Sequence, residues 1–245
     1  MTSKFCRMSQ TFRAEENHMV SSLTKEDWLR WQDELKLINL EAGSVLFEIG
    51  DPLTYVYFPT TAIISITRSL IDGELFEVAM IGREGVAGAS TLLGNGVTAS
   101  RGIVLRSGKA YRIRGTWIKN EFANSPHLRG LMLNFTQALI TQISQVSACS
   151  CHHSLDKRLC RWLLVFADRT ETTEILCTQE QLANTLGVRR ERLNKAANLL
   201  QRKGMIQYRR GSIHLMNKLA MKQHVCECYG IIKAAFTQLA AKATY

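Results

Sequence analysis

The sequence lacks any run of 18 or more apolar residues, so it contains no segment able to cross a membrane as a helix. Its first seven residues mix charged, polar and apolar side chains without an apolar centre, which argues against a secretory signal. The nucleophile-elbow, P-loop and HExxH patterns of common enzyme classes are also missing. These absences predict a cytoplasmic protein that is not an enzyme and has no membrane partner.

The cysteines do not form the pattern of a disulfide framework, because their number is odd (seven) and there is no secretory context. Four neighbouring residues could instead build a metal- or redox-responsive site: Cys149, Cys151, His152 and His153. Their Cys-x-Cys spacing is tighter than that of usual zinc sites. Cys226 and Cys228 could be distant partners, but in an apparent helix residues i and i+2 point apart. We expect cysteines that pack between helices and no metal site; a metal- or redox-responsive regulator is the alternative.

Basic residues outnumber acidic ones by 31 to 21, a net charge of +10. The excess lies in one half of the chain. Residues 1–150 hold 15 basic and 14 acidic residues, whereas residues 151–245 hold 16 and 7. The second half is therefore expected to bind a polyanion, and the motif described next favours duplex DNA over a lipid surface.

Residues 178–195 carry the most informative pattern of the chain. Apolar residues at helical spacing predict two short helices that pack on each other: Leu182, Ala183, Leu186, Val188, Leu193, Ala196, Ala197 and Leu200. Gly187 lies between the helices, where a sharp turn needs a permissive backbone. The second helix opens on a cation-rich stretch: Arg189, Arg190, Glu191, Arg192, Asn194 and Lys195. This is the polar start that a recognition helix presents to the DNA major groove.

A hairpin signal follows directly, because two short apolar runs flank Arg209-Arg210-Gly211-Ser212. A solvated pair of surface helices would also carry a charged face, and a lone helix-turn-helix pattern gives false positives. The glycine in the turn, the matching apolar faces and the hairpin together favour a winged helix-turn-helix that binds DNA.

The first half shows short β-branched and aromatic runs between turn residues. Eleven of the sixteen glycines lie between Gly43 and Gly115, and the last proline is Pro126. Five strands are predicted: Tyr55–Pro59, Ala62–Ile66, Leu75–Ala79, Gly102–Leu105 and Ala110–Ile113. Many short strands with frequent turns favour a β jelly-roll barrel, so the whole chain is predicted to be α+β.

A long helix is predicted to connect the two halves. Ser125 is suited to cap it and Pro126 to its first turn, and apolar residues recur to about Ala148. Such a helix could be buried within one chain or pair with its copy. A helix–helix seam through five residues favours a homodimer: Leu128, Phe135, Leu139, Ile143 and Val146.

A β-barrel, a long helix and a C-terminal winged helix, in this order, resemble the Crp–Fnr family of bacterial transcription regulators over roughly residues 23–217. The resemblance rests on Gly43–Gly50, on Gly82–Gly85 and above all on Thr178–Lys195. It implies a regulator that binds an inverted-repeat operator in double-stranded DNA as a homodimer. RNA polymerase is a further expected partner if the protein activates transcription.

On this resemblance the chain divides into five parts: residues 1–22 as a flexible tail, 23–120 as a cyclic-nucleotide-binding-like sensor β-barrel, 121–150 as the dimerisation helix, 151–217 as the winged helix-turn-helix domain, and 218–245 as a C-terminal helical extension that packs on the winged domain.

The resemblance also implies roles for residues of the DNA-binding half. Arg190, Glu191 and Lys195 are expected at base edges, where arginine can donate twice to guanine, glutamate can accept from cytosine and lysine can reach a guanine or a phosphate. Five residues are expected at phosphates: Thr178, Gln179, Arg189, Arg192 and Arg209. The structural alternative for Glu191 and Lys195 is an i, i+4 surface ion pair.

The sensor half departs from the cyclic-nucleotide-binding members of the family that it resembles. Those members place a Gly-Glu pair at the cavity and, several residues later, an arginine that clamps the cyclic phosphate. Here Arg83 follows Gly82, Glu84 is displaced by one position, and Thr98 stands where the arginine is expected. Arg101 is the nearby basic residue, three positions late. Losing a bidentate cation removes the main anchor for the cyclic phosphate, so we expect no cyclic nucleotide and no other cofactor. The effector is therefore unidentified. We expect Glu84 and Arg101 to line the pocket of the barrel.

Overall fold

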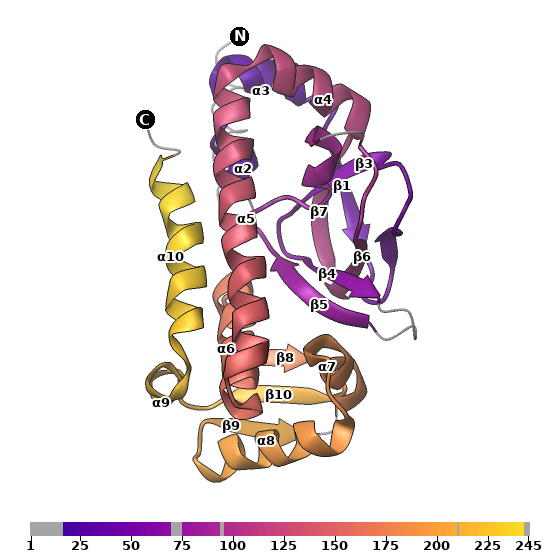
Figure 1. The fold of residues 1–245 in the computed structure, drawn as a ribbon. Coiled ribbons are helices and arrows are strands. Elements are labelled where there is room, and N and C mark those ends of the chain that lie inside the picture. Colours follow the sequence, from indigo (N-terminus) through magenta and orange to yellow (C-terminus); the bar gives the residue numbers. More distant parts are fainter. Residues whose placement is uncertain (1–16, 70–74, 94–95, 210, 243–245) are drawn as a thin grey trace, which may run out of the picture.

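The computed structural model describes residues 17–69, 75–93, 96–209 and 211–242. One long helix, α5 (Pro126–His152), runs along the molecule, with a β-barrel against its upper part and a winged helix-turn-helix at its lower end (Figure 1). This order of elements confirms the predicted α+β architecture.

Two short helices precede the barrel: α2 (His18–Ser21) and α3 (Lys25–Trp31). Asn17 is fully buried, and its amide nitrogen donates to the carbonyl oxygens of Pro59 at 2.9 Å and Gly85 at 2.7 Å. Its side-chain oxygen accepts from the N–H groups of Met19 and Val20 in α2. Residues 17–22 therefore do not belong to the flexible tail that was predicted for residues 1–22, because Asn17 anchors this segment. Residues 1–16 lie outside the described part.

Within the described residues the barrel has seven strands: β1 (Lys36–Leu40), β2 (Val45–Phe47), β3 (Tyr55–Pro59), β4 (Ile63–Ser69), β5 (Leu75–Ile81), β6 (Arg101–Arg106) and β7 (Gly108–Arg114). They pair antiparallel in two sheets of order β1-β7-β3 and β2-β6-β4-β5, and a short 3-10 helix, η1 (Ala89–Leu92), follows β5. Val56, Ile64 and Ile113 are buried between the sheets. All five predicted strands are present, and β1 and β2 add to them.

The helix α4 (Gly115–Asn124) leads from the barrel into α5. Ser125 caps α5 as predicted, because its Oγ accepts from the backbone N–H of Leu128 at 3.1 Å, and Pro126 occupies the first turn. α5 is longer than expected and passes the predicted boundary at residue 150.

Two of the five residues predicted for a dimer seam are buried inside one chain. Leu128 and Phe135 belong to the barrel core and are at most 2% exposed, so a second copy cannot contact them. The prediction fails for these two because apolar residues occupy two faces of α5, and the predicted stripe starts on the inner face. Leu139 and Val146 are half-buried. The outward-facing large apolar residues of α5 are Leu133, Ile140 and Ile143.

The DNA-binding half contains α6 (Leu155–Thr170), β8 (Glu174–Leu176), α7 (Gln179–Leu186), α8 (Arg190–Arg202), β9 (Ile206–Arg209) and β10 (Ser212–Leu215). Its three strands form an antiparallel sheet of order β8-β10-β9. Trp162, Leu163 and Phe166 of α6 form its core, and the same cluster includes Ile63 and Met80 of the barrel. The winged domain therefore packs directly on the barrel.

The C-terminal extension consists of α9 (Lys218–His224) and α10 (Glu227–Lys242). α10 turns back along α5 (Figure 1) and also contacts α6. The ring of Phe236 on α10 lies 6.3 Å from that of Phe135 on α5. The extension thus packs mainly on the long helix, and only in part on the winged domain as predicted. In the described part of the chain, no helix has both the length and the apolar character that crossing a membrane requires.

Candidate nucleic-acid interface

The helices α7 and α8 meet at the turn predicted around Gly187. Thr178 caps α7 through a reciprocal pair of bonds: its Oγ accepts from the N–H of Gln181 at 3.1 Å, and the Gln181 Oε1 accepts from the N–H of Thr178 at 2.9 Å. Gly187 ends α7 at φ +60°, the left-handed region that favours glycine. The turn brings together buried leucines of both helices: Leu182, Leu186, Leu193 and Leu200.

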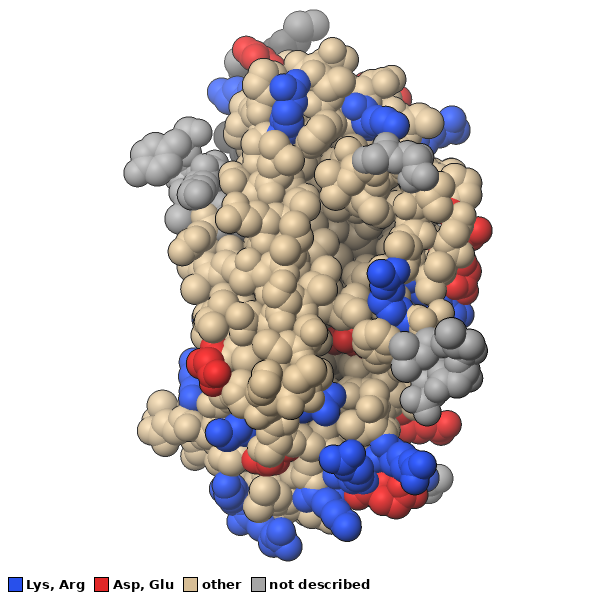
Figure 2. All heavy atoms as spheres, in the orientation of Figure 1, with Lys and Arg blue, Asp and Glu red and all other residues tan. Residues whose placement is uncertain are grey.

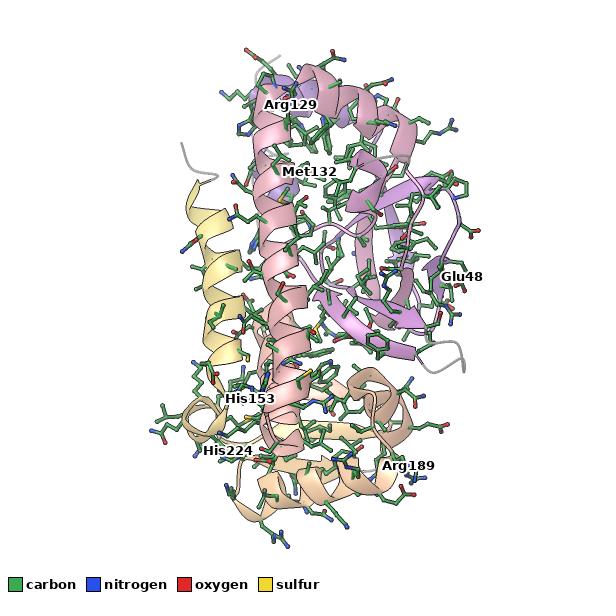
Figure 3. All side chains as sticks on the ribbon, in the orientation of Figure 1. Glu48, Arg129, Met132, His153, Arg189 and His224 are labelled. Carbon is green, nitrogen blue, oxygen red and sulfur yellow. The ribbon has the colours of Figure 1, made fainter. Side chains whose placement is uncertain are left out.

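The polar residues of this motif share one outer surface at the lower end of the molecule. Seven of the eight residues predicted to contact DNA are exposed: Thr178, Arg189, Arg190, Glu191, Arg192, Lys195 and Arg209. Gln179 is half-buried. Figure 2 shows cations gathered at this end, and Figure 3 shows Arg189 at the start of α8. The described part of the chain does not cover these side chains, so they are accessible to a binding partner. Arg210 of the wing lies outside the described residues.

A hollow of about 570 Å³ separates the starts of α7 and α8 from the wing. It is lined by Thr178, Gln179, Glu180, Arg190, Tyr208, Arg209 and Gly211. Arg190 donates from Nε to Gln179 Oε1 at 2.9 Å, which orients the guanidinium without using its two terminal amino groups. Those two groups are the donors that a bidentate contact with guanine needs.

The first turn of α8 adds positive potential to the same surface. Arg189 occupies the N-cap position but forms no side-chain cap, because a guanidinium has no acceptor atom. The N–H groups of this turn and the helix dipole therefore face outward beside the cations. Glu191 and Lys195 form no ion pair within the described structure. The i, i+4 surface ion pair considered as the alternative for these two residues is therefore not observed.

Two family models match the chain. Residues 157–223 match the Crp-like helix-turn-helix domain and residues 37–125 match the cyclic nucleotide-binding domain, in the order seen in the structure. Together they span more than half of the chain. The chain belongs to the Crp–Fnr family. Like the other regulators of this family, it carries the helix-turn-helix that binds DNA.

Individual relatives agree with this assignment. The global nitrogen regulator of Synechococcus elongatus is 21% identical over 199 residues, which cover 77% of this chain and 89% of the relative. The structure of FixK2 from Bradyrhizobium japonicum has a TM-score of 0.67 at 14% identity and covers 78% of this chain and 98% of FixK2. A Crp/Fnr-family transcriptional regulator from Thermus thermophilus has a TM-score of 0.63 at 17% identity, covering 77% and 97%. At these identities the two structures show a shared fold.

In this Crp–Fnr protein the barrel and the winged domain share buried polar contacts that no sequence pattern indicated. Arg169 of α6 contacts Glu84 of the barrel, with Nε and Oε1 2.7 Å apart. The Trp162 indole N–H of α6 donates to Glu77 Oε1 of β5 at 2.9 Å, and the Ser65 hydroxyl donates to the other Glu77 oxygen at 2.6 Å. Burial raises the pKa of the Glu77 carboxyl to about 7, against the opposing effect of these two donors.

The predicted effector pocket of the Crp–Fnr barrel is not formed by its two candidate residues. Glu84 pairs with Arg169 at the domain junction, whereas Arg101, at the start of β6, pairs with Glu48 at 2.8 Å. A hollow of about 300 Å³ does include Glu84, but α6 and α10 supply other walls and Arg101 does not line it. The prediction of one pocket shared by Glu84 and Arg101 is therefore corrected, because each is held in a separate ion pair. Thr98, at the position expected for the phosphate-binding arginine, is buried.

The cysteines are arranged differently from the cluster suggested by their neighbourhood in sequence. Cys151 and His152 are exposed, so they do not join a site with Cys149 and His153. The partners of Cys149 and His153 come instead from the C-terminal extension. Cys226 lies between α9 and α10, and Cys228 is in the first turn of α10, so the expectation that one helix points them apart is wrong.

Proposed function

We propose that the chain is a sequence-specific transcription regulator that binds an inverted repeat in double-stranded DNA as a homodimer. The observation that carries this proposal is the exposed, cation-rich start of α8, which stands beside the wing and the start of α7. This role places the protein in the cytoplasm and requires no catalysis. RNA polymerase is the further partner if the regulator activates transcription.

The outer face of α5 supports the dimer. Residues 130–155 contain no Asp, Glu, Lys or Arg. Leu133, Ile140 and Ile143 are exposed at 50%, 59% and 37%, and their steps of seven and three residues place them along one stripe. Figure 2 shows no charged residue along the middle of α5 in this view. A long uncharged face of this kind is suited to pairing with its own copy.

Two copies paired along α5 would present two α8 helices to one side of a duplex. In helix-turn-helix dimers the recognition helices are about 34 Å apart, one turn of DNA, so each half-site lies in a successive major groove. We assign Arg190, Glu191 and Lys195 to base edges. Five residues are assigned to phosphates: Thr178, Gln179, Arg189, Arg192 and Arg209.

Selection of bound sites from random duplexes at two salt concentrations tests the proposal. The expected result is an inverted repeat with half-sites one helical turn apart and an affinity that falls with salt. Arg190→Ala should weaken binding to the selected site by about 1–3 kcal/mol and relax the base preference at one base pair of each half-site.

Arg202→Ala is the matched control, because Arg202 is an exposed arginine at the opposite end of the same helix. It should leave the base preference unchanged. A single asymmetric half-site would contradict the dimer. An equal loss of affinity for all sequences in Arg190→Ala would contradict the base-reading role.

For the sensor barrel we propose that a cyclic nucleotide is not the signal. The support is the buried Thr98 at the expected arginine position, together with the ion pairs that occupy Arg101 and Glu84. Calorimetric titration of the full chain with cyclic AMP and with cyclic GMP should give no binding heat, and neither should change DNA affinity. Saturable binding of either nucleotide would refute this part of the proposal.

A further inference from the structure

Four side chains that DNA recognition does not use meet where α5 ends and α10 begins. Cys149 lies near the end of α5, and His153 is the C-cap residue of that helix. The backbone N–H of His153 donates to the Cys149 carbonyl oxygen at 3.1 Å, so the two residues are neighbours at the helix end. Cys226 and Cys228 approach them from the start of the C-terminal helix. The four donor atoms all lie within 4.8 Å of one another. Figure 3 shows His153 at the lower end of α5.

Two of the six distances between donor atoms match the edges of a tetrahedron around a metal ion. Cys149 Sγ and Cys226 Sγ are 3.6 Å apart, and Cys228 Sγ is 3.6 Å from His153 Nδ1. Zinc bonds of about 2.3 Å to sulfur and 2.0–2.1 Å to nitrogen place tetrahedral ligand atoms about 3.6–3.8 Å apart. A disulfide would need about 2.05 Å between the sulfurs. The three cysteines are free thiols.

Three of the four donors are closed off from solvent, and His153 is half-buried. Cys149, Cys226 and Cys228 are at most 4% exposed. The His153 Nε2 lies 3.3 Å from a carboxylate oxygen of Glu227, so an N–H donated there leaves Nδ1 as an acceptor facing the thiols. A carboxylate behind a ligating histidine is the usual means of fixing its tautomer and ring orientation. Cysteines that merely fill a core do not require a histidine oriented in this way.

We propose that Cys149, His153, Cys226 and Cys228 bind one Zn²⁺ ion in each chain. Thiolate and imidazole ligands select zinc over magnesium and calcium. Four protein ligands leave no open position for water or substrate, so the site is structural and not catalytic. Binding releases the three thiol protons to solvent and fastens the start of α10 to the end of α5. This proposal does not depend on the proposed DNA function.

The test uses the full chain, reduced and stripped of metal, then titrated with Zn²⁺ in competition with a chromophoric chelator. The wild type should bind one Zn²⁺ per chain, and Co²⁺ should give the charge-transfer and visible bands of a tetrahedral thiolate site. Cys228→Ser should weaken Zn²⁺ binding by more than 100-fold. Glu227→Gln keeps all four ligands and should weaken it by about 10-fold.

Cys151→Ser and His152→Asn are matched controls, because both residues are exposed and adjacent to the ligands on α5. Both variants should bind Zn²⁺ as the wild type does. The proposal is overturned if the wild type binds no stoichiometric Zn²⁺, if the Co²⁺ spectrum is octahedral, if anaerobically purified protein holds iron instead, or if the Cys151→Ser loss equals that of Cys228→Ser. The wild-type titration decides the matter even if Cys228→Ser does not fold.

Discussion

Arg169 Nε lies 2.7 Å from Glu84 Oε1, and the two side chains are only 6% and 11% exposed. The same guanidinium donates to Gln142 Oε1 at 2.5 Å and to the carbonyl oxygen of Met80. One buried cation on α6 therefore contacts the barrel and the long helix at once. This contact is one of several that hold the winged domain on the barrel, and in it Arg169 neutralises the Glu84 carboxylate across the junction between the two domains.

Arg169→Met is expected to destabilise the chain by about 3–5 kcal/mol, since it leaves Glu84 buried without its partner. Equilibrium unfolding in urea measures the loss. Adding Glu84→Leu removes the stranded charge, so the double variant should be more stable than Arg169→Met alone. If the changes in the free energy of unfolding caused by the two substitutions simply added, Arg169 and Glu84 would not be energetically coupled.

The buried carboxyl of Glu77 predicts a dependence of stability on pH. Its pKa is raised from 4.5 to about 7 by burial, despite the Ser65 and Trp162 hydrogen bonds and the nearby charges of Arg161 and Arg169. A raised folded-state pKa means that the protonated form is favoured in the folded chain. The stability that the protonated Glu77 carboxyl contributes is fully present below about pH 4.5 and is lost as the pH rises through about 7.

Glu77→Gln should therefore gain stability relative to the wild type as the pH rises from 5 to 8. The free energy of unfolding of both proteins across this range is the measurement. Glu180→Gln, which replaces an exposed carboxylate at the start of α7, should show no such trend. A difference between Glu77→Gln and the wild type that stays constant with pH would contradict the assigned pKa.

Local features of the fold were predictable from the sequence, because their causes lie within a few residues. The capping box at Thr178, the left-handed turn at Gly187 and the Ser125–Pro126 helix start each depend on neighbours four residues away at most. The strand Tyr55–Pro59 has the bounds that its β-branched and aromatic residues indicate.

Long-range contacts were not predictable, because no local pattern records which distant residue completes them. Arg169 and Glu84 are 85 positions apart, and Cys149 and Cys226 are 77 apart. The face of α5 was misassigned for a related reason. Apolar residues lie on both its inner and outer sides, so periodicity alone could not show that Phe135 packs on the barrel while Ile140 faces outward.

Ile140→Asp is expected to weaken the homodimer that we propose. Ile140 is 59% exposed at the middle of the uncharged face of α5, and a two-fold axis would place two carboxylates close together. The dissociation constant should rise at least about 10-fold, equivalent to 1.4 kcal/mol, as measured by sedimentation. Leu219→Asp is the control, because Leu219 is 69% exposed and belongs to another helix, α9. Equal dissociation in both variants would place the dimer interface elsewhere.

The helix-turn-helix can be destabilised without changing the charged residues that we assign to DNA contact. Gly187→Ala should destabilise the winged domain by about 1–2 kcal/mol, because an L-residue is strained at φ +60°. The added methyl would meet only Phe76 Cβ at 3.5 Å, an ordinary contact, so the effect should come from the backbone and not from a clash. Gly130→Ala, in the interior of α5 with open space around it, should instead be neutral or stabilising. Thermal unfolding of the two variants separates these effects, and a destabilised Gly130→Ala with an unchanged Gly187→Ala would contradict the assigned turn.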